Sequence, residues 1–414
     1  MKVTFCTYDS PSYLGGPSTW LKRLLPDLRD LGVELEVLFF LDGYAPNNCL
    51  CLVDLINHGI ACYTFPMKSS TEQKIHWILS QLTDRPPDIF VPHMLVAAFY
   101  ASRWIKAAGI PTIGVLHSDD EFYRGVLRQF VFGDPAYQLS ALVCVSEFLK
   151  HQVIHSGNTD IVVEQIACGV PISGKLTQPP TDQFRLIYVG RLEEEQKRIS
   201  DVTRALCQAS NQIPKIEAIL FGDGSARLNV EKILQESGQK QNVKLAGVVN
   251  SESIQKEMLA SHAIVLLSDY EGLPVALMEA MACGLVPICS EMQSGIPELV
   301  EDGVTGLLVR DRGESFVAAV RKLRDNSNLW QQLSVAAHHK IVSSFSREAC
   351  AQKWLALLNQ LHTQAQEKKL ISIPRFFMLP PVDAGLAWED RRRFRFAYRQ
   401  LRHRLGAVKR KILA

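Results

Sequence analysis

Short apolar runs alternate with segments of helical spacing along most of the chain, and this alternation restricts the fold more than any other feature. Seven runs in the first half have the composition of strands: residues 3–7, 34–40, 61–65, 89–91, 112–115, 141–145 and 162–166. Most segments between them place apolar residues every three or four positions, as Trp20, Leu24 and Leu28 show. Such alternation forms right-handed βαβ units on a parallel sheet. The sequence therefore predicts an α/β protein.

The length and one polar segment divide the chain into domains. With 414 residues, the chain exceeds the usual size of a single hydrophobic core. Residues 173–184 contain a glycine, two adjacent prolines and few apolar side chains, which is typical of a linker. A second α/β series follows it. We therefore predict a first domain over residues 1–172 and a second over residues 185–345.

A helix and a tail follow the second domain. Residues 346–365 have the pattern of a capped helix, in which Ser346 is the N-cap and Trp354 and Leu358 lie on one face. Residues 366–414 form the tail.

Apolar runs and cysteines bear on the compartment. No apolar run approaches the ~20 residues of a membrane span, and the first nine residues resemble a strand more than a secretory signal. The ten cysteines are scattered and show no CxxC pair, so we expect buried, reduced thiols. These features together predict a cytoplasmic protein.

The tail is strongly basic. Between Arg391 and Lys411 it holds ten Lys or Arg and no Asp or Glu, whereas the rest of the chain has 35 basic and 43 acidic residues. Six apolar residues recur there at steps of three and four: Phe394, Tyr398, Leu401, Leu405, Val408 and Ile412. Residues 391–412 therefore predict a basic amphipathic helix, which can bind an anionic membrane surface. The alternative is docking on the protein's own first domain or on a partner protein. We expect no nucleic acid partner, because the remainder of the chain is acidic.

The strand–loop–helix segment over residues 263–283 is the first candidate for a functional site. Glu271 lies in the loop after a buried strand, Pro274 suits the first turn of a helix, and Glu279 lies within the first two turns. A helix N-terminus carries free N–H groups that bind anions, so a phosphate could lie between two carboxylates. An ordinary βα unit with two solvated glutamates is the alternative.

The sequence around this segment resembles a known family. Residues 268–309 read SDYEGLPVALMEAMACGLVPICSEMQSGIPELVEDGVTGLLV, which is similar to the donor-site segment of retaining, GT-B-fold glycosyltransferases of family 4. The resemblance implies two Rossmann-like domains facing each other across a cleft, and a last helix that returns to the first domain. It places Glu271 and Glu279 in a nucleotide-sugar site, together with the loop residues Gly272, Leu273, Pro274 and Val275.

Further residues match the family's donor-phosphate site. Gly15 and Gly16 form a glycine loop before the first helix, where backbone N–H groups can approach phosphates. Arg191 follows a buried strand, and Lys197 or Arg198 lies at the start of the next helix. Two cations suit a diphosphate. We assign the second cation to Lys197.

Three other positions are assigned by the same resemblance. Gly222 and Val248 lie in turns that meet the nucleotide in the family, although both could be plain turns. His117 follows a strand at the sheet edge where ligands bind, and we assign it to sugar or acceptor positioning. Asp119 and Asp120 are lesser candidates.

The resemblance predicts a retaining transfer of a sugar from a UDP- or GDP-linked donor to a hydroxyl of a saccharide or lipid-linked acceptor. No Asp-x-Asp motif occurs, so we expect neither a metal site nor a separate cofactor. Two other readings stay open: a GT-B-fold sugar epimerase or phosphorylase, and a non-catalytic nucleotide-sugar-binding subunit of a polysaccharide assembly complex.

Overall fold

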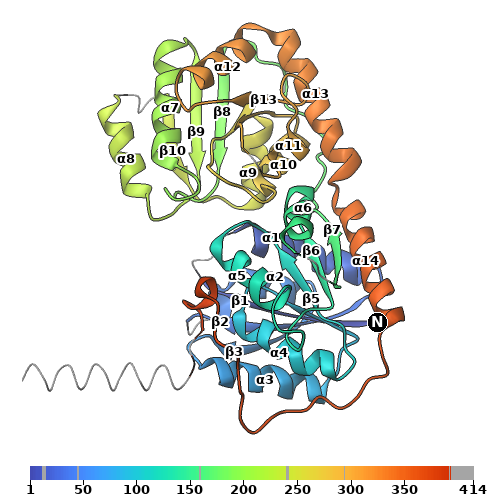
Figure 1. The fold of residues 1–414 in the computed structure, drawn as a ribbon. Helices are drawn as coiled ribbons and strands as arrows, with labels where there is room; N and C mark the ends of the chain where they lie inside the picture. Colours follow the sequence, from blue (N-terminus) through green and yellow to red (C-terminus); the bar gives the residue numbers. More distant parts are fainter. Residues whose placement is uncertain are drawn as a thin grey trace, which may run out of the picture.

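A computed structural model describes residues 1–11, 15–43, 46–157, 160–238, 242–292, 294–390 and 392. The described chain forms two α/β units, joined by a linker and by two long helices along one side (Figure 1). The fold predicted from the alternation of strands and helices is confirmed.

The N-terminal domain is built on parallel strands. One sheet has the order β3-β2-β1-β4, and a second has the order β5-β6-β7. A parallel bridge between Phe90 and Thr112 joins β4 to the start of β5. The seven strands are β1 (Lys2–Asp9), β2 (Glu34–Leu41), β3 (Ala61–Pro66), β4 (Ile89–Pro92), β5 (Ile113–Leu116), β6 (Ala141–Cys144) and β7 (Val162–Gln165).

The C-terminal domain contains one parallel sheet of six strands in the order β10-β9-β8-β11-β12-β13. These strands are β8 (Phe184–Val189), β9 (Ile216–Phe221), β10 (Val243–Gly247), β11 (Ala263–Leu266), β12 (Val286–Ser290) and β13 (Leu307–Val309).

Both domains reverse their strand order beside their first strand, between β1 and β4 and between β8 and β11. In open α/β sheets, ligands bind outside the carboxyl ends of the strands at such a reversal. This topology directs attention to the loops after β1, β4, β8 and β11.

Helices connect these strands. Those of the N-terminal domain are α1 (Gly16–Asp30), α2 (Leu50–Asn57), α3 (Thr71–Asp84), α4 (Val96–Ala107), α5 (Glu121–Phe130) and α6 (Glu147–Ser156), with the short η1 (Pro46–Asn48). Those of the C-terminal domain are α7 (Ile199–Gln212), α8 (Arg227–Glu236), α9 (Ser251–Leu259), α10 (Val275–Ala282), α11 (Ile296–Leu299), α12 (Glu314–Asp325) and α13 (Ser327–Ser344).

The helix α14 (Arg347–Gln364) packs on α1 of the N-terminal domain. The ring centroids of Trp20 and Trp354 are 5.7 Å apart, and Arg347 pairs with Asp27. Ser346 accepts a hydrogen bond from the N–H of Ala349, so its predicted role as the N-cap is confirmed. The two domains therefore share a helical support on one side (Figure 1).

The segment after α14 crosses the N-terminal domain, and we call residues 366–390 with Arg392 the C-terminal strap. It contains the short η2 (Ala384–Leu386), which packs on α5. Extended chain can remain ordered there because its backbone groups bond to the domain: Lys369 N–H donates to the carbonyl of Ala108, and the carbonyl of Pro381 accepts from Gln129. The tail predicted over residues 366–414 thus begins with a segment that is bound to the N-terminal domain. Its amphipathic helix, apart from Arg392, lies outside the described residues.

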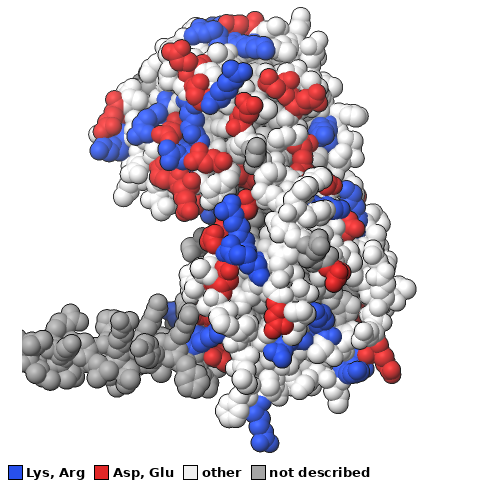
Figure 2. Space-filling model, viewed as in Figure 1, with Lys and Arg blue, Asp and Glu red and all other residues white. Residues whose placement is uncertain are grey.

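Three further features concern the core and the surface. Among the described residues, no helix is both long and apolar enough to cross a membrane. All ten cysteines are free, and nine of them are buried. Acidic and basic side chains are intermixed on the face of the molecule seen in Figure 2.

Candidate active site

Glu271 lies in the loop between β11 and α10, and its side chain is buried. Its Oε1 is 2.5 Å from Nζ of Lys197, while its Oε2 accepts from the amide of Gln196 at 3.3 Å. The side chain of Glu271 is 6% exposed and that of Lys197 is 13% exposed. A buried carboxylate paired with a mostly buried ammonium is held firmly, because separating them would leave an uncompensated charge.

The structure shows which of the two neighbouring cations, Lys197 or Arg198, lies beside the candidate site. Lys197 points to Glu271, whereas Arg198 adopts a left-handed backbone with φ of 51° and caps the start of α7. The guanidinium of Arg198 bonds to Asp201. Consecutive residues at this helix start therefore direct their charges to different places, and Lys197 is the one beside the candidate site.

Arg191 follows β8 and is half exposed. It donates to the carboxylate of Glu193 and to the amide oxygen of Gln196, each at 3.0 Å. The amide nitrogen of Gln196 in turn donates to the carbonyl of Tyr270 and to Glu271. Gln196 thus links Arg191 to Glu271.

The glycine loop of the N-terminal domain meets the start of α10. Pro274 is the N-cap of α10, one position before the first helical turn in which the sequence placed it. This shift arises because the backbone of Pro274 is extended, with ψ of 110°. A Cβ on Gly16 would lie 3.8 Å from Cγ2 of Val275. The loop of Gly15 and Gly16 therefore lies next to the first residue of α10, while Leu273 is buried.

Glu279 is not free at this site. Its Oε1 forms an ion pair with Arg23 of α1, on the other domain. Both side chains are mostly buried, and Nη1 of Arg23 is buried with no hydrogen-bond partner. The carboxylate that the resemblance places near the nucleotide is therefore occupied by a cation from the N-terminal domain.

We call residues 267–274, between β11 and α10, the donor loop, after the donor-site segment that they resemble, and its Gly272 lies against the N-terminal domain. A Cβ built on Gly272 would lie 2.0 Å from the carbonyl oxygen of His117. The carbonyl of Gly272 accepts from the N–H of Gly295 at 3.1 Å, and that contact fixes the other side of the loop. Only glycine fits between these two backbones.

His117 belongs to a chain of hydrogen bonds inside the N-terminal domain. Its Nε2 lies 3.0 Å from Nε2 of His93, and Nδ1 of His93 lies 3.0 Å from Oγ1 of Thr7. Trp20 packs on both imidazoles, with ring centroids 5.1 Å from His93 and 4.9 Å from His117. Burial lowers the pKa of His93 to about 3 and holds the pKa of His117 well below its ordinary value, and the neighbouring His93 lowers the latter further. Both rings are neutral, so one Nε2 donates and the other accepts.

The two aspartates after His117 have structural partners. Asp120 caps α5 by accepting from the N–H of Tyr123 at 3.1 Å, and burial raises its pKa. Asp119 forms two hydrogen bonds with Arg124, each at 2.9 Å. These contacts orient the loop that carries His117.

Gly222 and Val248 lie together at the carboxyl ends of β9 and β10. The N–H of Gly222 donates to the carbonyl of Gly247 at 2.9 Å, and Val248 is exposed beside it. Gly222 has φ of 142°, and a Cβ there would lie 1.9 Å from the carbonyl oxygen of Gly190, which precedes Arg191. The predicted residues Arg191, Gly222 and Val248 therefore share one edge of the sheet with Glu271.

Four residues that contact the candidate site residues, directly or through one another, were not identified from the sequence: Thr7, Arg23, His93 and Gln196. A signal existed for His93, since it follows a strand just as His117 does. Arg23 carried a weaker signal, because it lies three residues after Trp20, on the same face of α1. Nothing in the sequence marked Thr7 or Gln196.

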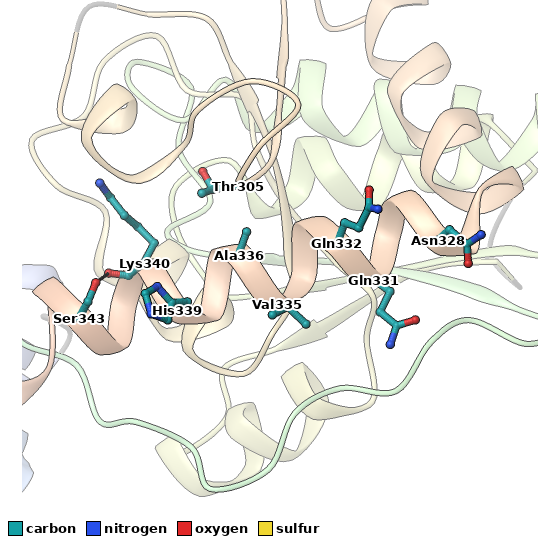
Figure 3. A pocket seen from close by; sticks show the side chains of 9 residues that line it. All are labelled: Thr305, Asn328, Gln331, Gln332, Val335, Ala336, His339, Lys340 and Ser343. Carbon is teal, nitrogen blue, oxygen red and sulfur yellow. Dashed lines mark hydrogen bonds between the residues drawn. The ribbon is translucent and has the colours of Figure 1, made fainter.

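A groove of about 830 Å³ lies elsewhere, along α13 (Figure 3). Its lining residues are Thr305, Asn328, Gln331, Gln332, Val335, Ala336, His339, Lys340 and Ser343. None of the predicted site residues lines it. Within the described ranges, no group of three or more His, Cys, Asp or Glu could hold a metal ion.

Comparisons with known proteins agree with this architecture. Residues 175–340 match the model described as "Glycosyl transferases group 1", and residues 14–173 match "Glycosyltransferase Family 4". The chain is 27% identical over 292 residues to the amylovoran biosynthesis glycosyltransferase AmsK of Erwinia amylovora, covering 66% of this chain and 70% of that protein. It is 24% identical over 328 residues to the lipopolysaccharide 1,6-galactosyltransferase of Escherichia coli strain K12, covering 74% and 84%.

Solved structures share the fold. Anabaena Alr3699/HepE in complex with UDP superposes with a TM-score of 0.71 at 19% identity, covering 87% of this chain and all of that one. The lipopolysaccharide outer core galactosyltransferase WaaB superposes with a TM-score of 0.65 at 19% identity, covering 87% and 99%. The fold and site thus define a two-domain GT-B protein. With both sequence matches, the chain is a GT-B glycosyltransferase.

Proposed function

We propose that this glycosyltransferase moves a sugar from a UDP- or GDP-linked donor to a hydroxyl of a saccharide or lipid-linked acceptor, with retention at the anomeric carbon. The observation that carries the proposal is the ion pair between Glu271 and the mostly buried Lys197, because the loop that holds Glu271 also touches the backbone of His117 in the opposite domain. Hydroxyl-binding and phosphate-binding groups thereby share a loop region with the His117 backbone of the other domain.

Each group has a role that follows from its chemistry. Lys197 and Arg191 stabilise the negative charge that develops on the leaving diphosphate, with help from the N–H groups at the start of α10. Glu271 accepts hydrogen bonds from hydroxyls of the transferred sugar. Glu279 accepts from the ribose when Arg23 releases it. His117 orients the sugar or the acceptor through Nδ1, because its Nε2 is committed to His93.

The proposed transfer needs no nucleophile from the enzyme. The acceptor oxygen forms a bond to the anomeric carbon on the face from which the bond to the diphosphate oxygen breaks. The proton of the acceptor hydroxyl passes to the departing diphosphate. Lys197 and Arg191 neutralise that diphosphate, so the proposed reaction uses no divalent metal.

The relatives support the donor class. HepE was solved with UDP and with UDP-glucose, and WaaB is a lipopolysaccharide outer core galactosyltransferase. AmsK is named for amylovoran biosynthesis, and the Escherichia coli relative is named a lipopolysaccharide 1,6-galactosyltransferase. The acceptor is then a growing saccharide at the cytoplasmic face of a membrane, and the basic tail would hold the enzyme there.

Release of nucleoside diphosphate tests the proposal. The protein is incubated with UDP-glucose, UDP-galactose, UDP-N-acetylglucosamine or GDP-mannose, and diphosphate is measured without acceptor. Slow hydrolysis of one donor is the expected result, and the configuration of the product is read by NMR. Binding without turnover would favour the non-catalytic subunit, and conversion of the donor into an epimer would favour the epimerase.

A further inference from the structure

The C-terminal strap lies beyond both matched family models, the second of which ends at residue 340. Its last part is fixed to the N-terminal domain by buried groups. Leu386 is fully buried against Gly125 of α5, where a Cβ would lie 2.9 Å from Cγ of Leu386. Gly385 abuts the carbonyl oxygen of Glu121, and Asp383 pairs with Arg128. The strap is thus attached to the helix that follows the His117 loop (Figure 1).

Two buried carboxylates of the strap, Glu389 and Asp390, attach it also to α3 and α4. Glu389 accepts from the N–H of Val96 at the start of α4 and lies 3.7 Å from Nζ of Lys74. Asp390 accepts from the hydroxyl of Thr71 at 2.7 Å and from Arg392 at 2.7 Å. Such partners are needed because an unpaired carboxylate could not remain buried there.

Trp388 lies between these anchors and yet is 67% exposed. Leu386, two residues before it, and Glu389, the next residue, are both buried, so the backbone that presents the indole is held in place. A single exposed aromatic ring is normal on a protein surface. A ring that a rigid backbone holds in solvent can bind a ligand at a small cost in conformational entropy.

The position of Trp388 connects it to the candidate site. Its ring centroid is 6.2 Å from that of Phe122, at an interplanar angle of 56°. The ring of Phe122 is 5.2 Å from that of Tyr123, which is 6.2 Å from His117. A continuous row of rings therefore leads from His117 outward to Trp388.

We propose that Trp388 and Phe122 form a subsite for a pyranose ring of the saccharide acceptor. A pyranose presents a face of C–H bonds, which carry partial positive charge and pack on the negative face of an aromatic ring. The row of rings begins at His117, so a sugar ring packed on Trp388 lies one or more sugar units away from the acceptor hydroxyl that reacts. This inference rests on the proposed transferase function.

The strap also carries exposed apolar residues away from Trp388, and they offer a matched control. Phe376 is 86% exposed on the same strap, twelve residues before Trp388. If exposed aromatic residues of the strap served a lipid surface, Phe376 and Trp388 would behave alike.

Saturation-transfer NMR with UDP and methyl glycosides of glucose, galactose, mannose and N-acetylglucosamine tests the subsite. We expect at least one glycoside to bind the UDP-loaded protein and its affinity to fall about tenfold in Trp388→Ala. Trp388→Phe should retain part of that affinity, and Phe376→Ala should match the unchanged protein. The UDP signal should stay the same throughout.

The outcomes separate this inference from the proposed function. Equal glycoside binding by the unchanged protein and Trp388→Ala overturns the subsite, as does the absence of any glycoside binding while UDP binds. A Trp388→Ala protein that loses only its sedimentation with anionic vesicles assigns the ring to lipid and also overturns it. Failure to bind UDP would instead count against the donor site.

Discussion

The backbone of Gly272 lies against the carbonyl oxygen of His117, so close that an added Cβ would be 2.0 Å from that oxygen. The two residues belong to different domains and lie far apart in the sequence. This contact sets how near the donor loop comes to the His117 backbone, and it leaves no room for a side chain at residue 272.

Gly272→Ala should therefore lower transferase activity by at least about tenfold, because the added methyl group pushes the donor loop and the His117 loop apart. Gly174→Ala is the matched control, since no atom lies within 4 Å of a Cβ at that linker position. Turnover and thermal unfolding are measured for both. Equal activity of the two variants would show that the contact does not matter for the reaction.

Glu271→Gln should reduce turnover by about 100-fold or more, since a neutral amide cannot balance Lys197 or accept as strongly from sugar hydroxyls. Far-ultraviolet circular dichroism and a thermal melt establish that the variant folds. Glu301→Gln, at an exposed position, serves as the control. Near-normal turnover in Glu271→Gln would remove this residue from the donor site.

Arg191→Ala should weaken binding of the nucleoside diphosphate by about tenfold, because a charge-assisted hydrogen-bonding group is lost. Arg191 is half exposed, and its partners Glu193 and Gln196 remain solvated without it, so stability should change little. Calorimetric titration with UDP measures the affinity. An unchanged dissociation constant would contradict the assignment of Arg191 to the diphosphate.

The sequence predicted the fold because strand and helix periods are local properties of the chain. It also predicted that Glu271, Arg191 and Gly222 lie at one sheet edge, since parallel strands bring their carboxyl ends together. Which of Lys197 and Arg198 faces Glu271 depends on the left-handed residue at the start of α7. No composition rule fixes that backbone angle.

Contacts between the domains were beyond sequence reasoning. Arg23 and Glu279 are 256 positions apart, and their ion pair depends on how two separately predicted domains are oriented. The strap was missed for a different reason. Its residues show no helical or strand period, and they are ordered by individual hydrogen bonds to the N-terminal domain.

The buried histidine pair predicts a dependence of stability on pH. The pKa of His93 is about 3 in the folded protein, below its ordinary value of 6.5. A lowered folded-state pKa means that the unfolded chain binds protons first, so stability is full above pH 6.5 and falls as the pH drops toward 3. One pKa unit corresponds to about 1.4 kcal/mol, so the loss reaches a few kcal/mol.

His93→Gln removes the titrating group while its amide can still bond to Thr7 and His117. We expect its unfolding free energy to fall less steeply than that of the unchanged protein between pH 6.5 and pH 4, as measured by denaturant titration. Turnover should fall while the donor KM stays constant, because His93 acts only by orienting His117. Identical pH profiles would show that His93 does not contribute to the acid sensitivity.

Turnover should survive a chelator. Lys197, Arg191 and the start of α10 supply the positive charge that a divalent ion would otherwise bring to the diphosphate. Diphosphate release is compared before and after EDTA and dialysis, and then after addition of magnesium or manganese. Activity that disappears with EDTA and returns with either ion would show that the reaction requires a metal.

The basic tail should bind the protein to anionic membranes, and the strap determines where the chain can be shortened to test this. Ending it near Pro381 would remove Glu389 and Asp390, which are buried partners of the N-terminal domain. A chain ending at Arg392 keeps those anchors and removes eight of the ten basic residues counted from Arg391 to Lys411. Each Lys or Arg near an anionic surface contributes about 1 kcal/mol, so the loss should be large.

The full chain should therefore sediment with vesicles of phosphatidylglycerol and phosphatidylcholine at low salt, and less so at high salt. The chain ending at Arg392 should remain in the supernatant and retain the same rate of donor hydrolysis, because its strap and donor domain are intact. A variant of the full chain with Leu401 and Leu405 replaced by Ser keeps the charge and removes part of the apolar stripe, so its binding should lie between the two. Equal sedimentation of the full and shortened chains would exclude the tail as the membrane anchor.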